Sequence, residues 1–428
     1  MATKQIFDIK EKFDEDKSIE SFQYHKYEPE TGVDLNQQEE IYIYINHPDK
    51  YYYPSKAYIT LEGQLQKSDG TAFADGDVIS LQHNALAYLF SNISLSLSGK
   101  QVESLNHPGQ ASTLLGMLTL PDDFSKAGGL NMCWFKDTGA TASLTDNTGF
   151  KVRHDYILSS NPKGTFSFSV PLSHILGVCE DYQKVLYGFG IQLVLNRQSD
   201  NEAIFRNTAA GAAKIHLTKC CLYMPIVKPS DMERLELAKV IENKSVLDVG
   251  YRMRECSTIQ VEQDTHFTWK LSNKSSPDHP RWIILAFQTN KRNNQETNSS
   301  IFDHCNLTNA YVELNDVRYP AIDYHLNMDK MQFSRMFKEV SEFREKYYGM
   351  DKLISNGGIN ASDYKDLFPV YIFDVSRQPD ALKYGTTNIT IECQFSQNVP
   401  AQTRAYCLAI SDRVLKFKSD GTHLSILS

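Results

Sequence analysis

The chain has 428 residues, of which 41% are hydrophobic and 22% are charged, and its formal net charge is −8. This length suits two all-β units of about 200 residues each better than one small domain. The negative charge argues against a chain that grips phosphate, because nonspecific nucleic-acid binding depends on clustered Lys and Arg. No apolar run approaches the ~20 residues that span a bilayer, so we expect no membrane insertion.

The cysteines and the first residues indicate the compartment. Eight cysteines lie without CxxC spacing at positions 133, 179, 220, 221, 256, 305, 393 and 407. This usage favours reduced thiols in the core over disulfides or a zinc site. The sequence MATKQIFDIKEKFDEDK contains neither an apolar signal core nor a small-residue cleavage site. We therefore expect synthesis in the cytoplasm or nucleus and no secretion.

Residues 1–38 are predicted to form an acidic N-terminal arm. They include Asp14-Glu15-Asp16, and the first alternating run, EIYIYI, begins only at residue 40. Segments of this composition are usually mobile until a partner docks them. Because an excess of Asp and Glu repels phosphate, we expect the arm to order on neighbouring protein subunits and not on DNA.

Short strand signals follow the arm. In NISLSLSGKQVES (92–104), apolar side chains alternate with serines, as in a half-buried antiparallel strand, and Ser98-Gly99 predicts a hairpin turn. A helix is predicted over 111–120, where Pro121 ends it. Alternating or aromatic-rich runs in this half lie at 40–45, 56–65, 92–97, 165–170, 187–195 and 213–224.

The segment VKPSDMERLELAKVIENK is predicted to be a helix between two halves of the chain. Pro229 breaks the preceding strand, and Ser230 with Glu233 has the pattern of a capping box. We place the domain boundary here. The first domain is expected at 39–228 and the second at 229–428, with a linker helix at 229–244.

The second half repeats these signals. NAYVELNDVRYP (309–320) has the hairpin pattern again, with Asn315-Asp316 at the turn. Asp329 is expected to cap a following helix that ends before Gly349. The core-facing stripe of this helix is predicted to be Phe333, Met336, Phe337, Val340 and Phe343. Strand runs lie at 245–253, 265–272, 281–288, 310–315, 368–375, 388–395 and 404–410.

Both halves contain the same landmarks in the same order: a hairpin, a helix, a strand, a strand that begins with Tyr-Gly, and a closing strand. The offset between them is roughly 200 residues, so the repeated unit is a whole domain. We therefore predict an all-β fold of two tandem antiparallel jelly-roll sandwiches with short inserted helices, that is, a double jelly roll.

Short blocks across residues 40–415 resemble the double jelly-roll major capsid proteins of Polinton (Maverick) elements and the related adintoviruses. The blocks are YYYPSKAYITLEGQL, LFSNISLSLSGKQVES, MCWFKDTGA, NAYVELNDVRYP, FPVYIFDVSRQPD and NITIECQFSQNVP. The resemblance implies a capsid protein of the virion, made in the host cytoplasm or nucleus. It also implies pseudo-hexameric homotrimers that contact neighbouring capsomers in an icosahedral shell around double-stranded DNA. A single jelly-roll penton protein is a further implied partner, and no sequence-specific nucleic-acid binding is expected.

Asp137-Thr138-Gly139-Ala140 has the sequence DTGA, which occurs at the active site of retroviral-type aspartic proteases. Such a site needs two carboxylates that share a proton, each on a turn after an apolar strand. Here Lys136 directly precedes the aspartate, and the resembling capsid family has a similar Lys-Asp-Thr stretch with no proteolytic role implied. We interpret the motif as a surface loop and expect no enzyme activity and no catalytic residue.

No cofactor or metal site is predicted. Gly188-Phe189-Gly190 lacks the third glycine and the following helix of a dinucleotide site, and we interpret it as the start of a strand. His304-Cys305 cannot by itself form a tetrahedral metal site.

Two alternative functions remain open from the sequence. A tandem jelly-roll carbohydrate-binding (lectin-like) protein would agree with the 23 Tyr and 22 Phe, although it is expected to be secreted. A β-sandwich glycoside hydrolase would need two carboxylates in a cleft. The short carboxylate clusters at Asp122-Asp123 and at Asp363 with Asp366 are instead expected to be solvated caps of loops.

Overall fold

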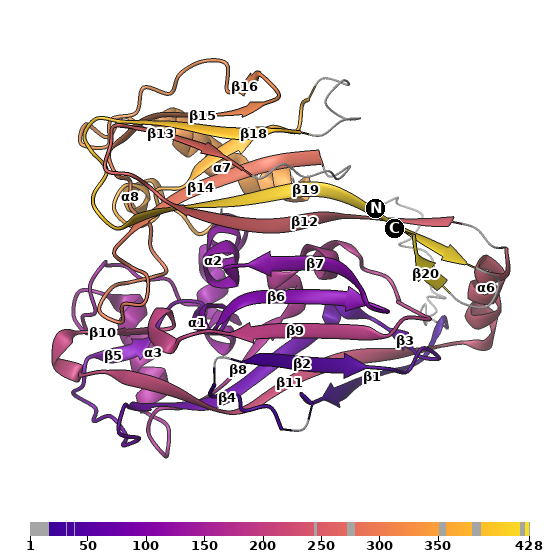
Figure 1. Ribbon diagram of the computed structural model, residues 1–428. Coiled ribbons are helices and arrows are strands. Elements are labelled where there is room, and N and C mark those ends of the chain that lie inside the picture. The colour runs from indigo at the N-terminus through magenta and orange to yellow at the C-terminus, as the bar shows by residue number, and fades with distance from the viewer. Residues whose placement is uncertain are drawn as a thin grey trace, which may run out of the picture.

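The computed structural model describes residues 17–30, 32–37, 39–243, 246–271, 279–350, 357–378, 387–419 and 424–427. Its antiparallel strands form two sandwiches, which lie one above the other in Figure 1. The first sandwich, at the bottom of that view, is built from residues before α6, and the second from residues after it. No helix among the described residues is long and apolar enough to cross a membrane.

The first sandwich contains the following strands: β1 (Ile19–Tyr27), β2 (Glu40–Ile45), β3 (Tyr51–Tyr52), β4 (Tyr58–Lys67), β5 (Ile79–Leu81), β6 (Phe90–Leu97), β7 (Lys100–Asn106), β8 (Thr165–Pro171), β9 (Ile191–Arg197), β10 (Ile204–Arg206) and β11 (Ala213–Pro229). One sheet has the order β1-β11-β4-β8, with β3 paired to β11. The opposite sheet has the order β2-β9-β6-β7, and β5 pairs with β10.

The second sandwich contains β12 (Val246–Gln260), β13 (His266–Lys270), β14 (His279–Thr289), β15 (Leu307–Leu314), β16 (Val317–Tyr319), β17 (Tyr371–Asp374), β18 (Ile389–Phe395), β19 (Thr403–Ser419) and β20 (Leu424–Ile426). Its sheets have the orders β12-β19-β14-β17, with β20 paired to β19, and β13-β18-β15-β16.

Short helices connect and cover these strands. The α-helices are α1 (Ala85–Tyr88), α2 (Pro108–Thr119), α3 (Thr148–Leu158), α4 (Leu172–Ile175), α5 (Gly177–Asp181), α6 (Asp231–Glu242), α7 (Ser334–Tyr348) and α8 (Ala361–Tyr364). The 3-10 helices span Pro54–Lys56, Asp122–Lys126, Gly129–Met132, Asp200–Glu202 and Thr208–Ala210.

The two sandwiches have equivalent strand orders. The closing strands β11 and β19 have 17 residues each and lie second in their sheets. In each half the first strand of the hairpin, β6 or β15, pairs with the strand that follows Tyr-Gly in the sequence, β9 or β18. The predicted duplication of a whole antiparallel unit is therefore confirmed.

The edge strand β1 corrects one expectation. We expected residues 1–38 to be an arm without strands, but residues 19–27 pair with β11 from Ile19–Pro229 to Tyr27–Leu222, where β12 pairs with β19 in the second sandwich. This strand has little signal in the sequence, because most of its side chains are exposed and show no apolar alternation. Residues 1–16 lie outside the described residues, so the expected docking of the arm stays a prediction.

Side chains that alternate along the strands fill the space between the sheets. In β2, for example, Ile41, Ile43 and Ile45 are buried, whereas the intervening Tyr44 is exposed. All eight cysteines are buried and unpaired, as predicted for reduced core thiols. Burial raises the pKa of the Cys133 thiol to about 11, which keeps this group neutral at physiological pH.

The two predicted hairpin turns have the same backbone geometry. Ser98 and Gly99 have φ values of 48° and 79°, and Asn315 and Asp316 have values of 43° and 72°. Two consecutive residues with positive φ are typical of a type I′ turn, whose twist matches that of the flanking strands.

The helices agree with the sequence in place but not in every boundary. The linker helix α6 is capped as predicted, because the Ser230 hydroxyl accepts a hydrogen bond from the Glu233 amide. Helix α2 begins three residues before the predicted 111–120, and all of its residues are buried between the sandwiches.

Helix α7 has the predicted C-terminal end but a different start. Gly349 follows it with a φ of 63°, and Met336, Val340 and Phe343 are buried on one face. Asp329 does not cap the helix, because Asn327 and Gln332 exchange two backbone hydrogen bonds and close a tight turn around it. The helix therefore begins only at Ser334.

The Asp316→Val variant tests the turn geometry. A β-branched residue at a φ of 72° is expected to lower the free energy of unfolding by about 1–2 kcal/mol. Asp316→Gly, the matched control, should cause no such loss, because glycine adopts this backbone conformation freely. Urea unfolding, monitored by fluorescence, gives the midpoint of each variant. Equal midpoints for the two variants would contradict the assigned turn geometry.

Candidate functional site at the interface between the sandwiches

The interface between the two sandwiches brings together the most buried charged groups among the described residues, including Glu103, Asp137 and Arg254. Strand β12 of the second sandwich packs against α5 and β7 of the first, and α7 packs against α2 (Figure 1). The hydroxyl of Tyr251 on β12 donates a hydrogen bond of 2.7 Å to the carbonyl of Val102 on β7. These contacts join residues about 150 positions apart in the sequence.

Glu103, next to Val102 on β7, is the carboxylate at the centre of this contact. It is 1% exposed and accepts hydrogen bonds from the amides of Gly177 (3.0 Å), Val178 (2.9 Å) and Arg254 (3.0 Å). Burial raises the pKa of Glu103 above its usual value, although the three amides favour the charged form. A carboxylate of the first sandwich thus accepts hydrogen bonds from backbone amides of both sandwiches.

Gly177 allows this close approach. A Cβ at position 177 would lie 1.8 Å from the carbonyl oxygen of Arg252, so no side chain fits between α5 and β12. The absence of a side chain lets β12 approach the start of α5 closely enough for the Arg254 amide to reach Glu103.

An ionic cluster extends from this point to α7. Arg254 contacts Glu180 at 2.6 Å, and the same carboxylate accepts hydrogen bonds from the hydroxyls of Tyr347 (2.7 Å) and Tyr348 (2.8 Å). Burial opposes ionisation of Glu180, but Arg254 and Tyr347 hold its pKa below the usual value. The cluster therefore joins α5 of the first sandwich to β12 and α7 of the second.

Arg252 adds a second ion pair beside the first. Its guanidinium binds Asp181, with the Nε–Oδ2 contact at 2.9 Å, and lies 3.8 Å from the centre of the Tyr347 ring. Arg252 and Arg254 are two residues apart on β12, so both side chains point to the same face of the sheet. Sequence reasoning missed this site, and its one signal is a pair of arginines at alternate positions of the strand run 245–253 and the residue after it.

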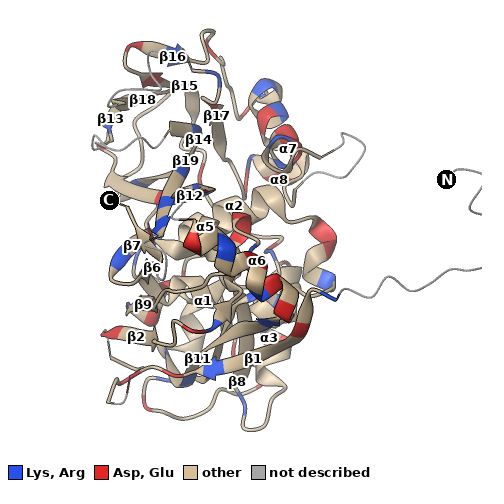
Figure 2. Cartoon of the chain, turned by 90° about the vertical axis from the view of Figure 1, so that its right-hand side faces the viewer, with Lys and Arg blue, Asp and Glu red and all other residues tan. Residues whose placement is uncertain are grey.

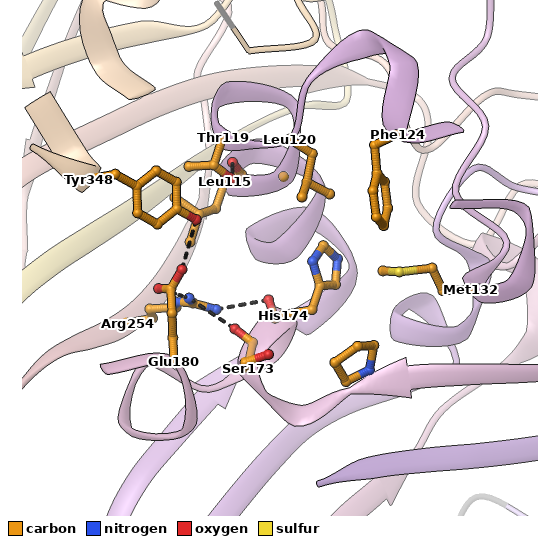
Figure 3. Close-up of a pocket in the computed structure, with 12 residues that line it drawn as sticks. Leu115, Thr119, Leu120, Phe124, Met132, Ser173, His174, Glu180, Arg254 and Tyr348 are labelled. Carbon is orange, nitrogen blue, oxygen red and sulfur yellow. Dashed lines mark hydrogen bonds and ion pairs between the residues drawn. The ribbon is translucent and has the colours of Figure 1, made fainter. Parts of the chain in front are cut away.

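A cavity of about 230 Å³ opens next to the cluster (Figure 3). His174 lies in its middle, between the Glu180–Arg254 pair and the side chains of Phe124 and Met132. The His174 Nε2 is buried and has no hydrogen-bond partner among the described residues. Burial, and then the charge of Arg254, lower the pKa of His174 to about 3, so the imidazole is neutral. The described residues contain no group of His, Cys, Asp and Glu that could hold a metal ion.

The aspartate of the DTGA motif is buried, which corrects the interpretation as a surface loop. Thr138 and Ala140 are exposed, but Asp137 is 1% exposed. Both of its carboxylate oxygens accept hydrogen bonds from Arg153 Nη2, at 2.8 and 3.0 Å. Asn298, from the second sandwich, donates to the same carboxylate at 2.9 Å. Asp137 can be buried because a guanidinium offsets its charge, and this carboxylate joins the two sandwiches.

The two predicted carboxylate clusters lie near each other. Asp122, Asp123 and Asp366 are exposed, as expected of solvated caps, whereas Asp363 is half-buried. Lys136 Nζ lies 2.8 Å from Asp122 and 3.5 Å from Asp363, and it donates to the carbonyl of Gly358 at 2.8 Å. The first members of the two clusters thus also form a bridge across the interface.

The other sequence candidates have structural positions. Phe189 is buried and Gly190 directly precedes β9, as expected of the start of a strand. Cys305 is buried, and His304 Nδ1 accepts a hydrogen bond from the Asn306 amide at 2.9 Å. Neither stretch lies with the interface cluster.

Replacement of Asp137 by Asn should destabilise the protein strongly. The variant leaves the buried Arg153 without a counter-charge, which costs about 3–5 kcal/mol. Asp155→Asn removes an exposed partner of Lys151 and should cost less than about 1 kcal/mol. Denaturant unfolding measures the loss of stability in both variants.

Wild-type protein incubated with an unfolded substrate at acidic and neutral pH should show no cleavage. Cleavage by the wild type that is lost in Asp137→Asn would contradict the structural role of Asp137.

His174 should make stability depend on pH. The pKa of His174 is about 3 in the folded protein against about 6.5 when unfolded, so below pH 6.5 the unfolded state binds a proton that the folded state does not. Stability should fall by about 1.4 kcal/mol per pH unit from this group, and His174→Gln should lack that slope. The exposed His216→Gln is the control. The free energy of unfolding, measured between pH 7 and pH 5, gives the slope for each variant. A slope in His174→Gln equal to that of the wild type would contradict the assignment.

Comparison with known proteins matches residues 79–415 to the double jelly roll-like domain. No curated protein sequence matches the chain. Among solved structures, PBCV-1 VP54 fitted into a reconstruction of the virophage Sputnik is 10% identical, with a TM-score of 0.57 over 98% of this chain and 99% of that chain.

Two further structures share the fold. The Faustovirus major capsid protein is 9% identical, with a TM-score of 0.56 over 96% of this chain and 92% of that chain. The mavirus major capsid protein is 9% identical, with a TM-score of 0.52 over 98% and 92%. The family match covers most of the chain and agrees with its two sandwiches of equivalent strand order, and the chain belongs to the double jelly roll-like domain family.

Proposed function

We propose that the chain is a major capsid protein that self-assembles as pseudo-hexameric homotrimers into an icosahedral shell enclosing double-stranded DNA. The observation that carries this proposal is the duplication: two sandwiches of equivalent strand order, joined by buried ion pairs. Three such chains around one axis supply six similar units, so a threefold object can occupy a hexagonal lattice position. The fold shared with the capsid proteins of Faustovirus and mavirus supports the capsid role.

The finer expectations belong to the same proposal. They are a boundary between the two jelly rolls at residues 228 and 229, membership of the Polinton and adintovirus group, and a single jelly-roll penton protein as a partner. The protein would lie in the virion after synthesis in the host cytoplasm or nucleus. The position of α6 between the last strand of one sandwich and the first strand of the other supports the boundary.

We further propose that the protein has no enzymatic role. Three of the carboxylates that sequence reasoning singled out are engaged with cations: Asp137 with Arg153, and Asp122 and Asp363 with Lys136. A catalytic pair of carboxylates needs a reacting group between its members. In this protein a lysine lies between Asp122 and Asp363, and Asp137 faces a buried guanidinium.

The oligomeric state tests the capsid proposal. Light scattering coupled to size exclusion should give about three times the chain mass of 48.7 kDa, with no appreciable folded monomer on dilution. Obligate interfaces of this kind bury more than ~2,000 Å². Negative-stain microscopy should show larger shells. A monomer at micromolar concentration that forms no particles at any salt or pH would contradict the proposal and favour the lectin-like alternative.

A further inference from the structure

The end of the first sandwich at which β1 begins carries an apolar groove of about 350 Å³. Its walls come from β1, the end of β11, the segment 183–185 and α6, which lies beside the ends of both strands (Figures 1 and 2). The apolar side chains that line it are Ile19, Phe22, Tyr53, Val185, Val227 and Leu237.

A β-bulge places the key side chains on one face. Pairing of β1 with β11 shifts register between Ile19 and Ser21, so that Ile19 lies opposite Pro229 and Phe22 lies opposite Val227. Pro229 and Val227 are two residues apart and share a face, so Ile19 and Phe22 share it too. These two side chains are 43% and 42% exposed, which is unusual for large apolar residues that lie next to each other.

Helix α6 extends this apolar surface. It has no buried residue, although it contains Met232, Leu235, Leu237, Val240 and Ile241. Met232 and Leu235 are 67% and 61% exposed. A helix with apolar residues around much of its circumference is normally buried, so this end of the molecule has the character of an interface.

The free edge of β1 offers a second kind of contact. Among the described strands β1 pairs only with β11, so the backbone groups on its other edge face no strand. β1 has nine residues, and a long edge strand with exposed apolar side chains is a site for adding another strand.

The N-terminal residues of the chain fit such a surface. In QIFDIKEKF (5–13), Phe7, Ile9 and Phe13 lie at odd-numbered positions together with Glu11, and the residues at 8, 10 and 12 are charged. In extended conformation this pattern presents three large apolar side chains on one side. The segment has nine residues, the same length as β1.

We propose that residues 5–13 of a second copy of this chain dock in the groove between β1 and α6. A second copy is favoured over the same chain because Ser18 and Ile19 themselves line the groove. To enter its own groove the chain would have to reverse direction within Asp14–Lys17, which contains three consecutive acidic residues that repel one another in a tight turn. The proposal rests on self-assembly and names the contact that links one copy to the next.

Cysteine cross-linking tests this contact in the full-length chain. All eight native cysteines are buried, so thiols introduced at Asp8→Cys and at Lys184→Cys, on the rim of the groove, are the accessible ones. The two variants carry different tags and are co-expressed. Mild oxidation should give a disulfide-linked dimer that carries both tags. Asp8→Cys with Tyr156→Cys, an exposed position on α3 at the other end of the sandwich, is the matched control.

The mixed-tag dimer should exceed that of the control pair by a factor on the order of ten or more, because docking raises the effective concentration of the two thiols. Equal yields from both pairs would overturn the proposal. A chain with both Asp8→Cys and Lys184→Cys that closes only an internal disulfide would also overturn it. If the unmodified chain is trimeric and forms shells while the cross-link is missing, the docking fails and the capsid proposal stands.

Discussion

The arrangement of the two sandwiches depends on compensating charges that are buried between them. A carboxylate or guanidinium without a partner in this interior would cost several kcal/mol, so each must find one within reach. Glu103 obtains donors from α5 and β12, and Asp137 obtains them from α3 and from Asn298 of the other sandwich. Because the partners come from both halves, the sandwiches cannot turn relative to each other without leaving a buried charge unpaired.

The proposed capsid role needs the two sandwiches to be held in a fixed arrangement. Two equivalent sandwiches on a flexible linker would present no fixed outline, whereas two held by Glu180, Arg254 and Asp137 form one asymmetric block with two similar halves. Such a block can repeat around a threefold axis. The three solved structures compared above are 9–10% identical to the chain, so this architecture does not depend on particular residues along its strands.

Two surfaces of the first sandwich, the interface with the second sandwich and the end where β1 begins, differ in how far they are covered. At the interface with the second sandwich, α2 is buried on all sides and Glu180 accepts hydrogen bonds from Arg254, Tyr347 and Tyr348. At the β1 end, α6 keeps its apolar residues at the surface and β1 has one unpaired edge. A surface that stays apolar in the single chain gains most from being covered, and therefore the proposed contacts between chains are to be sought there.

The sequence by itself determined the elements whose signals are local. Period-two alternation predicted most strands, Asn315-Asp316 and Ser98-Gly99 predicted the turns, and Ser230 predicted the start of α6, because each depends on neighbours within a few residues. β1 escaped prediction, since its side chains are exposed on both faces. Only the tertiary structure decided which charges meet. Glu103 and Arg254 are separated by 151 positions, and Asp137 and Asn298 by 161, so no spacing in the sequence records that they share a site. For the same reason DTGA looked like an exposed loop, when its aspartate is held inside by an arginine.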